Sequence, residues 1–125
     1  MHAVIETHAF RRACEGLGVS EDERLAITNM ISQNPTVGDL IKGTGGARKV
    51  RYAARGKGKS GGYRVITFFA ADDVPVFLLD VYSKGERINL TQGERNELRE
   101  ILGTLAEEWR QSVREKIIEI QARKS

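Results

Sequence analysis

The sequence predicts an α+β protein in which helices pack against one face of an antiparallel sheet and leave the other face for function. Two observations support this fold class, and the chain length indicates the number of domains. Two stretches open with a Ser or Thr followed three residues later by Glu, which is typical of a helix start, and apolar residues follow at helical spacing. Segments rich in β-branched and aromatic residues lie between them. The length of 125 residues fits one domain spanning residues 1–125.

The first 18 residues are expected to form a short strand and a short helix. Residues 3–6 (AVIE) have the apolar character of a strand. Residues 9–17 follow as the helix, which ends at Gly16 or Gly18 because glycine readily ends a helix.

The second helix begins after Ser20, and Glu23 completes its capping box. The helix runs to about Gln33, and the pair Asn34-Pro35 ends it because the residue before a proline disfavours helical backbone angles. Four residues are predicted to face inward: Leu25, Ile27, Met30 and Ile31.

The middle of the chain is expected to form three antiparallel strands. A glycine-rich turn over residues 42–46 precedes them, the glycine-rich loop 55–62 joins the first two, and Asp72-Asp73 forms the second hairpin turn. The run VPVFLLDVY in the third strand is almost wholly apolar and therefore predicts a buried, near-central position. The expected strands are residues 48–53, 63–71 and 74–82.

Thr91 and Glu94 form the second capping box, which opens a long C-terminal helical region. Gly103 is expected to mark a break or kink in it. The apolar residues that recur at three- and four-residue spacing are Leu98, Ile101, Leu102, Leu105, Trp109, Val113, Ile117 and Ile120.

Composition excludes several classes of protein. Cys14 is the only cysteine, which excludes an internal disulfide and a cysteine zinc site. With only His2 and His8 besides, no metal is expected, and no motif implies another cofactor. The N-terminal residues lack the apolar run of a secretory signal and no stretch approaches 18 apolar residues, so we expect a cytoplasmic protein without a membrane partner.

Positive charge is concentrated in the middle of the chain. Residues 40–71 contain no acid and eight cations, whereas the remainder holds 12 basic and 17 acidic residues. The segment therefore has a net charge of +8 and the remainder of the chain a net charge of −5. A concentrated positive charge attracts polyanions, which predicts a nucleic-acid surface rather than a merely solubilising one. The eight cations are Lys42, Arg48, Lys49, Arg51, Arg55, Lys57, Lys59 and Arg64.

Familiar phosphate and nuclease motifs are absent from this basic segment. GKS occurs at residues 58–60, but no glycine stands at the spacing of a nucleotide-binding P-loop and no helix follows. Neither histidine lies in the segment, and it holds no pair of carboxylates. Acid–base chemistry there must therefore use lysine, arginine or tyrosine.

The run RKVRYAARGKGKSGGYRVITFF, followed by LLDVYSKGERINLT, resembles the RelE/HigB superfamily of bacterial toxins from type II toxin–antitoxin pairs, and the HigB-like branch most closely. The resemblance covers roughly residues 20–105. It implies a compact fold with a basic concave face, ribosome-dependent cleavage of messenger RNA, and neutralisation by a small antitoxin. We expect that antitoxin to be of the helix-turn-helix type and encoded nearby.

The resemblance also implies the site residues. Loop lysines and the arginine that opens the next strand match Lys57, Lys59 and Arg64, and a later basic position matches Lys84, with Arg87 beside it. Further RNA contacts are expected from Arg48, Arg51 and Arg55.

The acid–base residue stays open. Well-known members of the superfamily carry a tyrosine or histidine near the C-terminus, whereas here Tyr82 comes earlier and only Trp109 is aromatic later. RNA can be cut by attack of its own 2′-hydroxyl on the adjacent phosphate, and Arg64 can grip the non-bridging oxygens. Neighbouring cations favour the neutral form of a lysine, so Lys57 or Lys59 can serve as the base, with Tyr82 as the alternative.

Two other functions are compatible with the sequence. A toxin of the same fold can act by binding, as the ParE branch does on DNA gyrase, although such a protein needs no cluster of phosphate-cleaving cations. A non-catalytic RNA-binding module would normally carry stacking aromatics among its basic residues, and only Tyr52 and Tyr63 are available.

Overall fold

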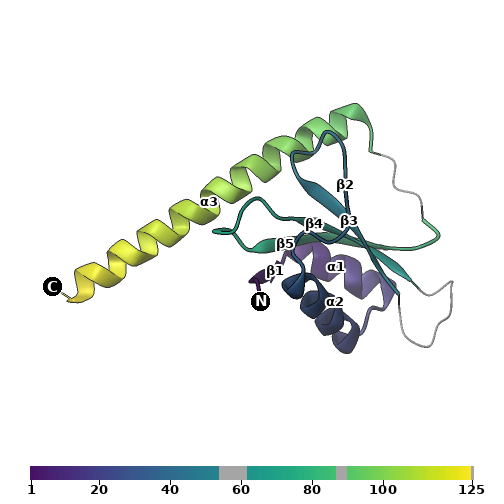
Figure 1. Cartoon of the computed structure of the whole chain (residues 1–125), viewed down its shortest axis with the longest axis horizontal. Coiled ribbons are helices and arrows are strands. Elements are labelled where there is room, and N and C mark those ends of the chain that lie inside the picture. The colour runs from purple at the N-terminus through teal and green to yellow at the C-terminus, as the bar shows by residue number, and fades with distance from the viewer. Residues whose placement is uncertain (54–61, 87–89, 125) are drawn as a thin grey trace.

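The structure is a computed structural model and describes residues 1–53, 62–86 and 90–124. Its elements in chain order are β1 (Val4–Glu6), α1 (His8–Leu17), α2 (Glu21–Gln33), β2 (Asp39–Leu40), β3 (Ala47–Tyr52), β4 (Tyr63–Phe68), β5 (Val76–Ser83) and α3 (Gln92–Lys124). A five-stranded sheet lies between two helical layers, with α1 and α2 on one face and the first half of α3 across the other (Figure 1). The predicted α+β class is confirmed.

The strand order in the sheet is β1-β5-β4-β3-β2. The strands β3, β4 and β5 pair as two antiparallel hairpins, as expected. The strand β1 runs parallel to β5, with Val4 opposite Val76, so the expectation of a wholly antiparallel sheet is wrong for this strand. Most of the chain separates β1 from β5, and therefore no tight turn sets their relative direction.

The strand β2 was not expected from the sequence. Asp39 and Leu40 are both exposed and pair with Lys49 and Arg48, which places β2 at the edge of the sheet. Gly38, just before it, has a φ of 95°, and a Cβ there would lie 2.5 Å from the carbonyl oxygen of Lys49. Only glycine permits this close approach. Two exposed residues are too few to show the alternation that marks a strand.

The β4–β5 hairpin is confirmed, but its strands are displaced from the expected bounds. Asp72-Asp73 forms the turn, and the N–H of Val74 donates to the carbonyl of Ala71 at 3.1 Å inside it. Hydrogen bonds within the turn replace pairing between the two strands next to it. The strand β4 therefore ends earlier, and β5 begins later, than expected. As predicted, β5 is buried: it lies between β1 and β4, and Leu78 is 0% exposed.

The two N-terminal helices begin and end where the sequence indicates. Ser20 and Glu23 form the predicted capping box, and Gly18 ends α1 with a φ of 71°. Ile27 and Ile31, one turn apart on α2, are both 0% exposed. Leu25 is 59% exposed, so its predicted inward position is wrong. It lies two residues from Ile27, which turns it well away from the buried face.

Buried side chains form one cluster on each face of the sheet. The first joins α1 and α2 to the sheet and includes Phe10, Ile27, Ile31, Val50, Val65, Leu78 and Val81. The second joins α3 to the opposite face and includes Ala47, Phe68, Val74, Phe77, Leu102 and Ala106. The α3 helix therefore occupies part of the face that we expected to be open.

The α3 helix is one continuous helix of 33 residues, so the expected break at Gly103 is wrong. A Cβ at Gly103 would meet no atom within 4 Å, which shows that no close packing requires the glycine there. Thr91 and Glu94 form the predicted capping contacts, with both backbone N–H donors at 3.1 Å from side-chain oxygens. Among the described residues, no helix combines the length and apolar character needed to cross a membrane.

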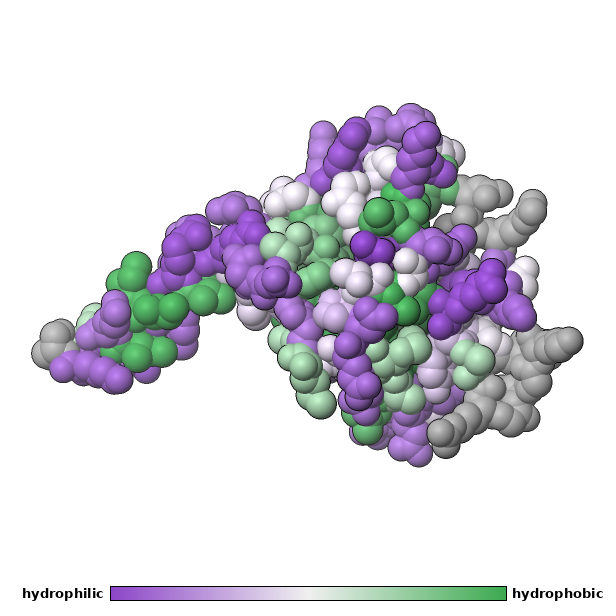
Figure 2. Space-filling model, viewed as in Figure 1, coloured by the Kyte–Doolittle hydropathy of each residue, from purple (hydrophilic) through white to green (hydrophobic). Residues whose placement is uncertain are grey.

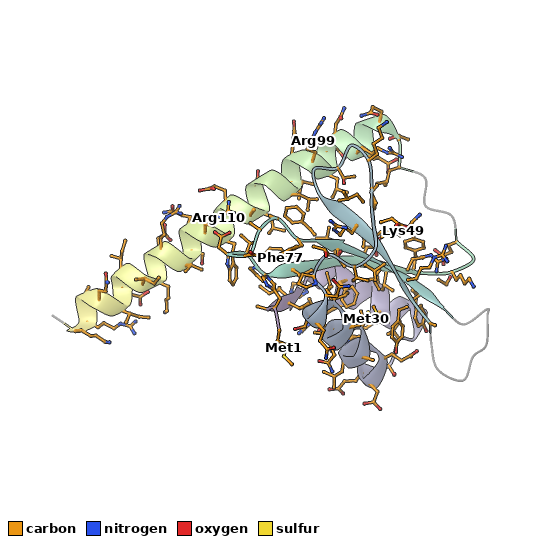
Figure 3. All side chains as sticks on the ribbon, viewed as in Figure 1. Met1, Met30, Lys49, Phe77, Arg99 and Arg110 are labelled. Atoms are coloured by element: carbon orange, nitrogen blue, oxygen red, sulfur yellow. The ribbon has the colours of Figure 1, made fainter. Side chains whose placement is uncertain are left out.

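Contacts at two places hold the first half of α3 on the sheet. Near its start, Arg95 donates to the carbonyl oxygen of Lys42 at 3.0 Å. Four turns later, Arg110 donates to both carboxylate oxygens of Asp73, and Trp109 meets Phe77 edge-on with ring centroids 6.3 Å apart. Figure 3 labels Phe77 and Arg110 where α3 crosses the sheet. Beyond this point α3 extends past the sheet (Figure 1).

Candidate nucleic-acid interface

A row of three polar residues crosses β3, β4 and β5 on the face that α3 partly covers. The register pairs Arg51 with Arg64 and Arg64 with Tyr82. Their neighbours Val50, Val65 and Val81 belong to the opposite core, and alternation along each strand therefore turns the row toward the α3 side. The structure thus brings together Arg51, Arg64 and Tyr82, three of the residues predicted from the sequence.

The pairing of Arg51 with Arg64 is unfavourable for the sheet itself. Directly opposed cross-strand residues have Cβ atoms about 4.5–5.5 Å apart, and like charges at that distance repel. Neither guanidinium forms an ion pair with an acid in the described parts of the chain. Two uncompensated guanidinium groups on one row favour an anionic ligand such as a phosphate.

A cavity of about 590 Å³ adjoins this row. Its floor includes Ile66 and Tyr82 from the sheet, and Leu98 of α3 lines one wall. Five charged residues also line the cavity, and Figure 3 labels Lys49 among them: Asp39, Lys42, Lys49, Asp80 and Arg95. A lining of apolar residues with three cations and two acids suits a group that has both an apolar part and polar or charged atoms.

Tyr82 and Asp80 are the titratable side chains on the β5 side of the cavity. Burial raises the pKa of Tyr82 above its usual 10.0, although nearby Arg64 opposes the shift. Burial also raises the pKa of Asp80, with a further contribution from Glu86. Tyr82, only 6% exposed, therefore keeps its proton at neutral pH and can donate it.

Lys84 lies at the base of the glycine-rich loop. Its backbone N–H donates to the carbonyl of Gly62 at 3.0 Å. A Cβ at Gly62 would lie 3.6 Å from Cδ of Lys84 and 3.3 Å from the carbonyl oxygen of Tyr52. The lysine stem thus packs against the glycine that precedes β4, two residues before Arg64.

Arg48 lies apart from the row. It alternates with Lys49 and shares the face of Val50, which belongs to the α1–α2 core. Its guanidinium donates to the carbonyl oxygens of Thr36 and Gly38 at 3.0 and 3.2 Å, and so it fixes the segment before β2. The structure does not bring Arg48 together with Arg64.

Four predicted site residues lie outside the described residues: Arg55, Lys57, Lys59 and Arg87. Their roles stay predictions from the sequence.

Five charged cavity residues were absent from the sites predicted from the sequence: Asp39, Lys42, Lys49, Asp80 and Arg95. Asp80 sits inside the apolar run of β5, and a lone acid in a buried strand was a signal that could have drawn attention to it. Arg95 comes from another element, and its position depends on how α3 packs. Its buried Nε–H has no acceptor within the described part of the chain.

These features define a small α+β protein with a cationic row and an adjoining cavity on one face of its sheet. Comparison with protein families then identifies the particular kind. The model of the family described as RelE toxin of the RelE / RelB toxin–antitoxin system matches residues 2–124. The chain belongs to this RelE toxin family, as its resemblance to the RelE/HigB superfamily predicted. It is therefore a toxin of a toxin–antitoxin system, and the family implies a cognate RelB-type antitoxin as its partner.

Proposed function

We propose that this toxin is a ribosome-dependent endoribonuclease that cuts messenger RNA and thereby stops translation in the cytoplasm. The observation that carries the proposal is the row of Arg51, Arg64 and Tyr82, in which two guanidinium groups without an ion pair among the described residues lie beside a protonated phenol. Membership of the RelE family supports the same activity.

In the proposed reaction the RNA supplies its own nucleophile. The 2′-hydroxyl oxygen attacks the adjacent phosphorus, a cyclic 2′,3′-phosphate forms, and the bond to the 5′-oxygen of the next nucleotide breaks. Negative charge grows on the non-bridging oxygens during attack. Arg64 carries a planar fork of donors that matches two such oxygens, and Arg51 opposite it adds a second positive charge.

Two proton transfers complete the reaction. The 2′-hydroxyl must lose a proton, and the departing 5′-oxygen must gain one. Tyr82 is our candidate for the second role, because its hydroxyl keeps a proton to give at neutral pH. Lys57 and Lys59 are our candidates for the base, and we propose Lys84 as a further positive charge for the reacting phosphate.

The test is single-turnover cleavage of messenger RNA on programmed ribosomes by Arg64→Ala, Arg64→Lys and wild type. We expect Arg64→Ala to lower the cleavage rate by about 10²–10³, the usual loss for one group that stabilises developing charge. Arg64→Lys should recover only part of that loss, because an ammonium group cannot grip two oxygens with a rigid fork.

The matched control is Arg12→Ala, which removes an exposed cation from α1 on the other side of the sheet. It should cleave like wild type. Equal rates for Arg64→Ala and wild type would remove Arg64 from the site. A wild-type protein that stops growth without cutting any message would overturn the nuclease proposal and favour a toxin that acts by binding.

A further inference from the structure

The second half of α3 extends past the sheet. Every residue from 111 to 124 is exposed, whereas Leu102 and Ala106 earlier on the same helix are buried. Figure 1 shows this half reaching away from the other elements, and Figure 2 shows hydrophobic surface on it. We refer to residues 111–124 as the free half of α3.

The apolar stripe of α3 continues unbroken into the free half. Leu102, Ala106 and Trp109 follow one another at helical spacing and pack on the sheet. Val113 and Ile117 continue the same spacing, but they are 39% and 50% exposed. Ile120 ends the stripe at 42% exposed. The stripe that anchors the helix therefore runs on beyond the surface that it packs against.

An exposed apolar stripe on a helix indicates a contact site for another protein. Contiguous exposed apolar surface on a soluble domain commonly marks a contact site. Most helical stability in proteins comes from packing an apolar face, and short isolated helices are marginal in water. Both considerations predict that the free half is covered in its working state.

Charge on the helix distinguishes between possible partners. The free half, residues 111–124, holds four cations and two acids, a surplus of +2. Glu119 pairs with Lys116 and Arg123, and these pairs neutralise charge of both signs, so the net surplus of the segment stays at +2. Two copies of the free half would bring equal positive surpluses together, whereas an acidic partner would offset them. The cations of the free half are Arg114, Lys116, Arg123 and Lys124.

We propose that the free half of α3 docks an acidic amphipathic helix of the cognate antitoxin. The apolar face of that helix covers Val113, Ile117 and Ile120, and its acids meet the basic flanks. The site lies beyond the sheet edge and apart from the row of Arg64, so it anchors the antitoxin without itself filling the cavity. The proposal rests on the antitoxin partner that the family implies and not on RNA cleavage.

Adjacent isoleucines provide the test. Ile117 lies on the stripe, whereas Ile118 is turned about 100° from it and is 64% exposed. Because both side chains are exposed, substitution of either should leave the domain folded. Full-length Ile117→Asp and Ile118→Asp are compared with wild type by isothermal titration with the purified product of the adjacent antitoxin gene.

We expect Ile117→Asp to weaken binding by about 10- to 100-fold, the usual loss for a buried apolar contact, and Ile118→Asp to bind within about threefold of wild type. Wild-type affinity should also fall as salt is raised. Equal affinity of all three proteins would overturn the proposal. So would a wild-type dimer, seen by analytical ultracentrifugation without antitoxin, that Ile117→Asp dissociates and Ile118→Asp does not. That result would assign the stripe to a second copy.

Discussion

Asp80 shows how a single residue can conflict with the strand that holds it. The strand β5 is otherwise almost wholly apolar, and one oxygen of Asp80 accepts a hydrogen bond from the N–H of Val81 at 2.8 Å. Burial nevertheless raises the pKa of the carboxyl group, and Glu86 adds to the shift. The native state therefore holds the charged form of Asp80 at a cost in free energy.

We expect Asp80→Asn to be more stable than wild type at pH 7. A carboxyl whose folded pKa lies above its unfolded value destabilises the folded state once both forms are ionised, and this cost is absent below the unfolded pKa. The advantage of the variant should therefore shrink as the pH falls toward about 4, the ordinary aspartate pKa. Urea denaturation at several pH values measures it.

Asp72→Asn is the control, because Asp72 is exposed in the hairpin turn. It should unfold at the same urea concentration as wild type. A less stable Asp80→Asn at pH 7 would show that nearby cations favour the charged carboxylate, contrary to the direction of the pKa shift. The same variant then becomes informative in the cleavage assay, because Asp80 lines the cavity next to Tyr82.

At the scale of elements, α3 combines two roles along one helix. Its first half supplies the second core, with Leu102 only 1% exposed. The neighbouring Ile101 is 60% exposed although it has the same size and hydrophobicity. The helical rotation of about 100° per residue separates the two side chains.

We expect Leu102→Ala to lower the free energy of unfolding by about 2–5 kcal/mol, since it removes a buried side chain and leaves a cavity between α3 and the sheet. Ile101→Ala should change it by no more than about 0.5 kcal/mol. Urea denaturation followed by tryptophan fluorescence measures both, because Trp109 packs against Phe77 in the same core. Equal losses would show that the two residues share one environment, contrary to the packing described.

At the scale of the whole molecule, the structure separates a folded body from a helical extension. Near the point where α3 leaves the sheet, Trp109 contacts Phe77 and Arg110 pairs with Asp73 of the body. The residues beyond are exposed and hold one another through ion pairs and hydrogen bonds on the helix surface. Such exposed pairs contribute little to stability.

We expect a chain that ends after Arg110 to keep the stability of the body within about 0.5 kcal/mol. Circular dichroism should lose helical signal in proportion to the deleted turns, and the urea midpoint should stay where it is in the full chain. A large fall in the midpoint would mean that the extension packs on the body, and the free half of α3 would then be part of the fold.

Local chemistry alone determined several parts of this protein. The capping boxes at Ser20 and Thr91 set the starts of α2 and α3, because their hydrogen bonds form within four residues of chain. The almost wholly apolar run of β5 predicted its buried position, and the acid-free segment 40–71 already contained both Arg51 and Arg64 of the row. Each of these follows from neighbours along the chain.

Tertiary structure decided what depends on distant partners. Arg48 and Arg51 look alike in sequence, but they lie on opposite faces of β3. Arg48 shares the face of the α1–α2 core and donates to backbone carbonyls, whereas Arg51 lies in the row of Arg64 on the α3 side. The parallel direction of β1 depends on the fold as a whole, because no turn joins it to β5. The apolar residues of the α3 stripe keep the same spacing on both sides of the sheet edge. The position of that edge therefore decides which part of the stripe is buried.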